Sequence, residues 1–157
     1  MNKIFLLGLL FVSLQASAGS AWEESGVPLA KPVEVTVHRS PSCGCCGKWI
    51  EHMRNSGFVI KDIKESDMDA VKRRAGVPKV LESCHTAELG GYVVEGHVPA
   101  KDIKKMLNEK AAFLGLAAPG MPAGSPGMEM GGHKDDFSVI AFDKQGNADI
   151  YVEHKGY

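Results

Sequence analysis

The sequence carries no excess of charge of either sign. Its 157 residues contain 18 lysines and arginines against 19 aspartates and glutamates, a net charge of −1. Such a chain supplies no positive field for phosphate groups, which excludes nucleic acid as a partner. The densest basic run, residues 72–74, is explained as the solvated face of a helix. Blocks of like charge are also absent, and 44% of the residues are apolar, which excludes disorder for most of the chain.

Long apolar runs are equally scarce, and only the start of the chain comes close to one. Residues 4–12 are almost all apolar, follow Lys3 and precede a small-residue pattern at 16–18. These are the parts of a secretory signal peptide, so residues 1–18 are predicted to be removed. A bilayer span needs about twenty apolar residues, so no membrane insertion is expected after that removal. The mature protein is therefore predicted to be periplasmic.

The pattern beyond residue 18 predicts one α/β domain. Residues 19–32 form a polar lead-in, and residues 33–114 follow the order β-α-β-α-β-β-α. This order is thioredoxin-like, with a parallel pair of strands extended by an antiparallel hairpin and helices covering the sheet. The predicted strands are 33–39, 58–63, 84–89 and 92–96, and the predicted helices are 48–56, 66–76 and 99–114.

The last part of the chain, residues 115–157, is predicted to pack on the same domain. Residues 115–134 are so rich in glycine and proline that no regular element is expected there. Residues 137–142 and 148–153 alternate around a turn, which predicts a C-terminal β-hairpin.

Cysteine is rare, and its four copies are unevenly placed. Cys43, Cys45 and Cys46 lie together where the first strand gives way to a helix, and Cys84 is remote. A disulfide framework spreads its cysteines, and adjacent cysteines rarely meet disulfide geometry, so a metal or redox site is indicated. A helix N-terminus favours the thiolate, which is both nucleophile and metal ligand. Clustered thiolates suit Cu(I) or zinc and can bridge several Cu(I) ions.

The glycine pair at residues 90–91 predicts a two-residue hairpin turn that places Cys84 opposite His97. Directly opposed side chains project from the same face, about 5 Å apart. In a thioredoxin-like sheet the start of this hairpin lies beside the first cysteines, so Cys84 and His97 are expected to face them. His85 is expected to point to the other face. A hydrogen-bonded His97 at a helix N-terminus is an equally good explanation.

Met128, Met130 and His133 form a third candidate group, within the Gly/Pro-rich segment. Thioether sulfur is a soft ligand that favours Cu(I) and needs no deprotonation. The alternative is that such methionines cover an apolar surface. His38 and His52 are expected at the surface.

Four sequence motifs, in this order, resemble the CopG family of small exported proteins found with bacterial copper-resistance systems. They are Cys-Gly-Cys-Cys-Gly-Lys-Trp at 43–49, Ser-Cys-His-Thr-Ala at 83–87, Gly-Tyr-Val-Val-Glu-Gly-His-Val-Pro-Ala at 91–100 and Gly-Met-Pro-Ala-Gly-Ser-Pro-Gly-Met-Glu at 120–129. The resemblance covers roughly residues 33–154 and implies a thioredoxin-like fold in the periplasm. It also implies a cysteine-bridged, polynuclear copper site built from Cys43, Cys45, Cys46 and Cys84, with interconversion of Cu(I) and Cu(II).

Three functions stay open at this point. The first is a copper-resistance protein that holds Cu(I), has copper ions and other periplasmic copper-handling proteins as partners, and acts as a copper oxidoreductase. The second is a thiol–disulfide oxidoreductase with Cys43 as nucleophile and Cys46 as resolving thiol, against which Cys45 offers a competing disulfide partner. The third is a non-redox metallochaperone or a zinc protein, which leaves the methionine-rich segment unexplained.

Overall fold

The computed structural model describes Trp22 and residues 28–157, so the predicted signal peptide and most of the predicted lead-in lie outside the described residues. The strands are β1 (Glu34–Arg39), β2 (Val59–Lys64), β3 (His85–Leu89), β4 (Tyr92–Gly96), β5 (Gly115–Ala118), β6 (Phe137–Phe142) and β7 (Ala148–His154). The helices are α1 (Gly44–Asn55), α2 (Met68–Ala75), α3 (Ala100–Glu109) and a short 3-10 turn at Lys79–Leu81. Within the described part of the chain, no helix is long and apolar enough to cross a membrane.

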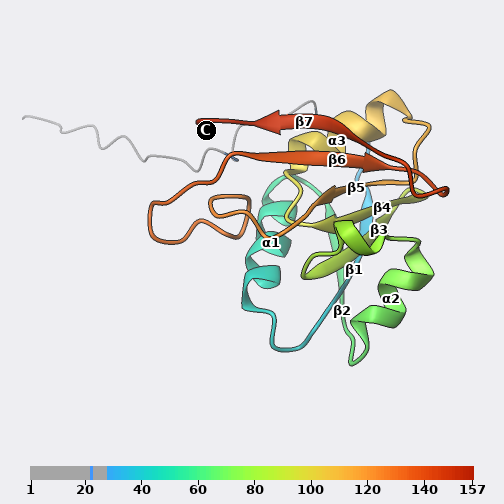
Figure 1. Cartoon of the computed structure of the whole chain (residues 1–157), viewed down its shortest axis with the longest axis horizontal. Helices are drawn as coiled ribbons and strands as arrows, with labels where there is room; N and C mark the ends of the chain where they lie inside the picture. Colours follow the sequence, from blue (N-terminus) through green and yellow to red (C-terminus); the bar gives the residue numbers. More distant parts are fainter. Residues whose placement is uncertain (1–21, 23–27) are drawn as a thin grey trace, which may run out of the picture.

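All seven strands belong to one sheet, in the order β2-β1-β3-β4-β5-β6-β7, which gives the predicted α/β class (Figure 1). β1 pairs in parallel with β2 and antiparallel with β3, and β3 pairs antiparallel with β4. The hairpin between β3 and β4 turns at Gly90 and Gly91, both with positive φ, a conformation glycine adopts without strain. Leu89 pairs with Tyr92 across this turn, which is the predicted register.

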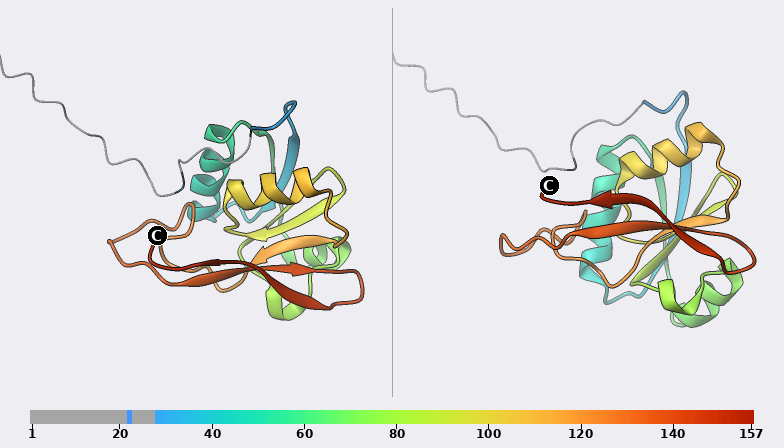
Figure 2. Two further views of the ribbon diagram at one scale, coloured as in Figure 1. Left: turned by 90° about the horizontal axis from the view of Figure 1, so that it is seen from above. Right: turned by 45° about the horizontal axis from the view of Figure 1, so that its top comes forward.

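The helices cover both faces of the sheet. α1 and α3 lie on one face and α2 on the other (Figure 2). Side chains alternate accordingly along β4, because Val94 belongs to the large core under α1 and α3 while Val93 belongs to the smaller core on the opposite face. The start of α1 and the start of β3 are thereby brought to the same end of the sheet.

One predicted irregular segment is a strand. Residues 115–118 form β5, which pairs in parallel with β4 and antiparallel with β6, so the expectation of no regular element is wrong there. A Cβ on Gly115 would collide with the Val93 carbonyl, so only glycine lets the two backbones approach this closely. The small residues that suggested a loop are buried in the sheet, and β5 connects the predicted C-terminal hairpin to it.

Two histidines expected at the surface have structural partners instead. His38 is only 8% exposed, and its Nδ1 lies 2.7 Å from a carboxylate oxygen of Glu65. His52 is half-buried on α1, and its Nε2 accepts a 3.0 Å hydrogen bond from the backbone N–H of Ala100 at the start of α3. His52 therefore caps α3, a role for which the sequence has no local signal because the two residues are far apart along the chain.

Acidification is expected to weaken the fold through His52. Burial, together with the charge of Lys104, lowers the pKa of His52 from 6.5 to about 4. Between these values the unfolded chain binds a proton that the native chain excludes, so the free energy of unfolding falls as the pH drops from 6.5 to 4, by about 3 kcal/mol. Denaturant unfolding at several pH values measures this. His52→Gln keeps an acceptor without titrating and should lose this part of the pH dependence, whereas the exposed control His133→Gln should keep it.

Candidate metal centre

The first three cysteines lie at the N-terminus of α1. Cys43 occupies the N-cap position with extended backbone, and the first turn of the helix contains no acidic residue. Arg39 holds this loop, because its guanidinium donates one hydrogen bond to the Cys43 carbonyl and two to the Asp62 carboxylate, each 3.0 Å long. The positive end of the helix dipole therefore faces these sulfur atoms with no acidic residue in the first turn of α1 to oppose it, an arrangement suited to anionic sulfur ligands.

The fourth cysteine lies with the other three. One ligand atom from each of Cys43, Cys45, Cys46 and Cys84 lies within 4.8 Å of every other. Cys43 and Cys46 are joined by a disulfide with 5.4 Å between their Cα atoms, while Cys45 and Cys84 are free thiols. The Cys45 Sγ is 3.6 Å from the Cys43 Sγ. Reduction of the disulfide would leave four thiols in one group.

Two histidines adjoin this sulfur group. The Cys84 Sγ lies 2.9 Å from Nε2 of His97, as the hairpin register predicted, and 3.3 Å from Nδ1 of His85. Cys84, His85 and His97 form a second set of donors within 4.8 Å of one another. The expectation that His85 points away is wrong. The site lies at the start of β3, where Cys84 precedes the strand and His85 is its first residue, so two successive side chains both reach it.

Burial sets the charge of these three side chains. Burial, followed by the effect of the neighbouring Cys45, raises the pKa of Cys84 to about 12. It also lowers the pKa of His85 far below the usual value and lowers the pKa of His97. Both imidazoles are therefore neutral at pH 7, with a ring nitrogen available to a metal ion, whereas the Cys84 thiol must release its proton when a metal binds.

Hydrogen bonding orients the His97 ring. Its Nδ1 donates to the carbonyl oxygen of Pro126 at 2.7 Å, which leaves the Nε2 lone pair facing Cys84. The His85 ring is fully buried 4.4 Å from the ring of Trp49, and its Nε2 has no hydrogen-bond partner among the described residues. Both rings are thus held by the protein before any metal binds.

The Gly/Pro-rich segment covers the start of α1 with its backbone. Gly127 has φ +83°, and a Cβ there would lie 2.6 Å from the backbone nitrogen of Trp49 and 3.0 Å from the carbonyl oxygen of Cys45. Met128 follows directly and is half-buried, whereas Met130 is 59% exposed. His133 belongs to neither donor set, because it is exposed and its Nε2 pairs with Asp135 at 2.9 Å.

A buried ion pair supports the segment that carries Cys84. Glu95 on β4 accepts a 2.6 Å hydrogen bond from the Ser83 backbone N–H and a 2.7 Å bond from the Thr86 hydroxyl, and it contacts the Lys72 ammonium. The prediction of a solvated basic face is wrong for Lys72, which is only 4% exposed. Lys72 on α2 faces the sheet because the helix packs against β3. The hydrogen bond to Glu95 thereby fixes Ser83, the residue before Cys84, to β4.

Four cysteine sulfur atoms and two neutral imidazoles at one end of an α/β sheet define a candidate centre for a soft metal ion. Comparison with known proteins agrees with this class. Two solved structures of copper resistance protein CopG, forms 2 and 1, are 48% and 49% identical to this chain, with TM-scores of 0.76 and 0.75. Each match covers 80% of this chain and 100% of the other.

This chain therefore belongs to the CopG family of copper resistance proteins. A family model described as a protein of unknown function, DUF411, matches residues 81–128. This range includes Cys84, His85 and His97 of the candidate centre. No curated protein matches the chain. The family resemblance found in the sequence motifs is confirmed.

Proposed function

We propose that this protein binds copper as Cu(I) and serves copper resistance, with the thiolates of Cys43, Cys45, Cys46 and Cys84 as the main ligands. The observation that carries the proposal is the convergence of these four sulfur positions within 4.8 Å. Soft thiolate ligands select Cu(I), and the two related solved structures are of a copper resistance protein.

The two donor sets support a polynuclear site. One set holds four sulfur ligands and the other holds Cys84 with two imidazoles, so the Cys84 sulfur belongs to both. A thiolate shared in this way is positioned to bridge two Cu(I) ions. His97 and His85 then complete the second set. Met128, Met130 and His133 are proposed as further ligands, since the backbone of their segment covers the start of α1.

We also propose a thioredoxin-like core and a periplasmic location. Four neighbouring strands in the order β2-β1-β3-β4, with β3 antiparallel to the others, support the first. The signal-peptide pattern of residues 1–18 and a Cys43–Cys46 disulfide, which persists in oxidising compartments, support the second. Residues 33–114 would form the core domain, with residues 115–157 packed on it.

The Cys43–Cys46 disulfide favours redox chemistry as a second candidate function. Two thiols that form one disulfide release two protons and two electrons, which would reduce two Cu(II) ions to Cu(I). The reverse transfer would oxidise two Cu(I) ions. The same dithiol could instead exchange with a disulfide of another protein, as in a thiol–disulfide oxidoreductase.

Anaerobic titration of the fully reduced protein with Cu(I) and with Zn(II) separates these functions. We expect more than one Cu(I) per chain, bound in preference to Zn(II), and a smaller copper count in Cys45→Ser. Ser42→Ala, an exposed neighbour of the cluster, is the control and should bind as the wild type does. Binding of no more than one Cu(I), or a preference for Zn(II), would contradict the proposal. Disulfide reductase activity retained in Cys45→Ser, with a wild type indifferent to copper, would favour the oxidoreductase.

A further inference from the structure

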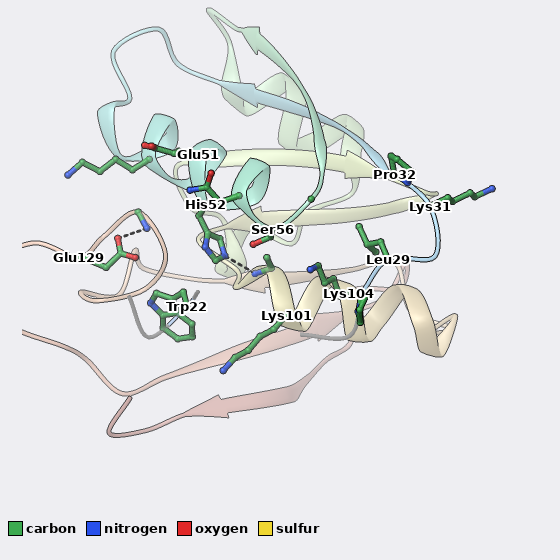
Figure 3. Close-up of a pocket in the computed structure, with 16 residues that line it drawn as sticks. Trp22, Leu29, Lys31, Pro32, Glu51, His52, Ser56, Lys101, Lys104 and Glu129 are labelled. Atoms are coloured by element: carbon green, nitrogen blue, oxygen red, sulfur yellow. Dashed lines mark hydrogen bonds between the residues drawn. The ribbon is translucent and has the colours of Figure 1, made fainter. Parts of the chain in front are cut away.

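A cavity of about 810 Å³ lies along α1 and α3, and none of the described residues that line it is a cysteine (Figure 3). α1 contributes Glu51 and His52 to its wall, and α3 contributes Lys101 and Lys104. The volume is within the range of small-molecule binding sites. None of the residues proposed above as copper ligands is among the described residues that line this cavity.

Lys104 is the unusual residue of this cavity. It is only 6% exposed, and among the described residues it has neither a hydrogen bond nor an ion pair. Figure 3 shows it between α1 and α3, close to His52 and Ser56. Its neighbour Lys105 shows the usual arrangement, with a side chain 49% exposed and an ion pair of 3.9 Å to Glu109. Its Nζ is not among the fully enclosed polar atoms, so the ammonium can be reached from the cavity, and an anion there would be its first ion-pair partner among the described residues.

The rest of the lining adds to the positive charge and provides an apolar wall. The charged residues among the described lining are four lysines against two glutamates, namely Lys31, Lys48, Lys101, Lys104, Glu51 and Glu129. One glutamate is already engaged, because Glu129 accepts a 2.7 Å hydrogen bond from the Gly127 backbone N–H. The apolar wall includes Trp22 and Leu29, and the Lys101 ammonium lies 5.2 Å from the ring centroid of Trp22.

We propose that this cavity binds a small organic acid whose carboxylate contacts Lys104 and Lys101 and whose apolar body packs on Trp22 and Leu29. The burial of Lys104 favours a free small molecule over a polypeptide, because the charged group of the ligand has to reach between two packed helices. A carboxylate on an ammonium forms a charge-assisted hydrogen bond, which is stronger than a neutral one.

Titration of the ¹⁵N-labelled protein with 2-naphthoate tests this proposal, with the uncharged 2-naphthamide as the matched ligand. We expect 2-naphthoate to shift the amide signals of residues 51–57 and 100–104 and to bind at least about tenfold more tightly than the amide, as one charged hydrogen bond implies. Lys104→Met should weaken 2-naphthoate binding by about tenfold or more. Lys105→Met on the same helix should leave it unchanged.

Equal binding of the acid and the amide would overturn the proposal, and so would wild-type affinity in Lys104→Met. Tighter binding of the capped peptide acetyl-Phe-Glu-Phe-amide than of 2-naphthoate would overturn the small-molecule assignment. The acid–amide comparison uses the wild type, so it decides the question even where Lys104→Met fails to fold. The cavity lining among the described residues contains no proposed copper ligand, so this proposal and the copper proposal can fail separately.

Discussion

Protein carrying the Cys43–Cys46 disulfide is expected to bind Cu(I) about 10⁴-fold more weakly than the fully reduced protein. The disulfide removes two of the four thiolates that converge at the start of α1. Loss of a residue that only orients a ligand already costs about 10- to 100-fold in metal affinity. Loss of a ligand itself costs at least the upper end of that range, and two losses multiply.

Competition with a chromogenic Cu(I) chelator under anaerobic conditions measures this difference. Thiol titration provides the control, because the oxidised protein should show two free thiols and the reduced protein four. Reduction of the oxidised sample should restore the affinity in full. Equal affinities of the two forms would show that Cys43 and Cys46 are not copper ligands and would leave the disulfide as a separate redox centre.

The sequence predicted those parts of the fold that have a local pattern. The order of helices and strands up to α3 follows from alternation and helical spacing, and the turn at residues 90–91 set the register that brings Cys84 to His97. β5 was missed because its glycine and alanines show no alternation of polar and apolar residues. Their small size is what allows close pairing with β4. A glycine- and alanine-rich composition therefore suggests a loop even where the small residues are needed for close packing of strands.

The sequence predicted that all four cysteines belong to the candidate centre. Of its two histidines it placed His97 there but not His85. Spacing alone indicated that Cys43, Cys45 and Cys46 act together. The place of His85 depends on where β3 begins, and strand ends are the least certain feature of a sequence-based prediction. Contacts between distant segments, such as His97 with Pro126, have no local signature at all.

Cys84→Ser is expected to lower Cu(I) affinity by about 10⁴-fold and to reduce the copper count per chain. Cys84 belongs to both donor sets, so its loss removes a sulfur ligand from each, and the hard hydroxyl oxygen of serine is a poor replacement for Cu(I). Cys45 belongs to one set only, so Cys45→Ser should cost about 100-fold. The ratio of the two effects, rather than either alone, tests whether the Cys84 sulfur is shared.

Both variants are measured by chelator competition and by the number of copper–sulfur bonds in X-ray absorption spectra. Circular dichroism and thermal unfolding of the metal-free variants establish that the fold is retained. A Cys84→Ser variant no more impaired than Cys45→Ser would contradict a shared sulfur, and the two sets would then act as independent sites. A larger loss in Cys84→Ser, with copper–copper scattering present in the wild type and absent from the variant, is the result that a bridged site requires.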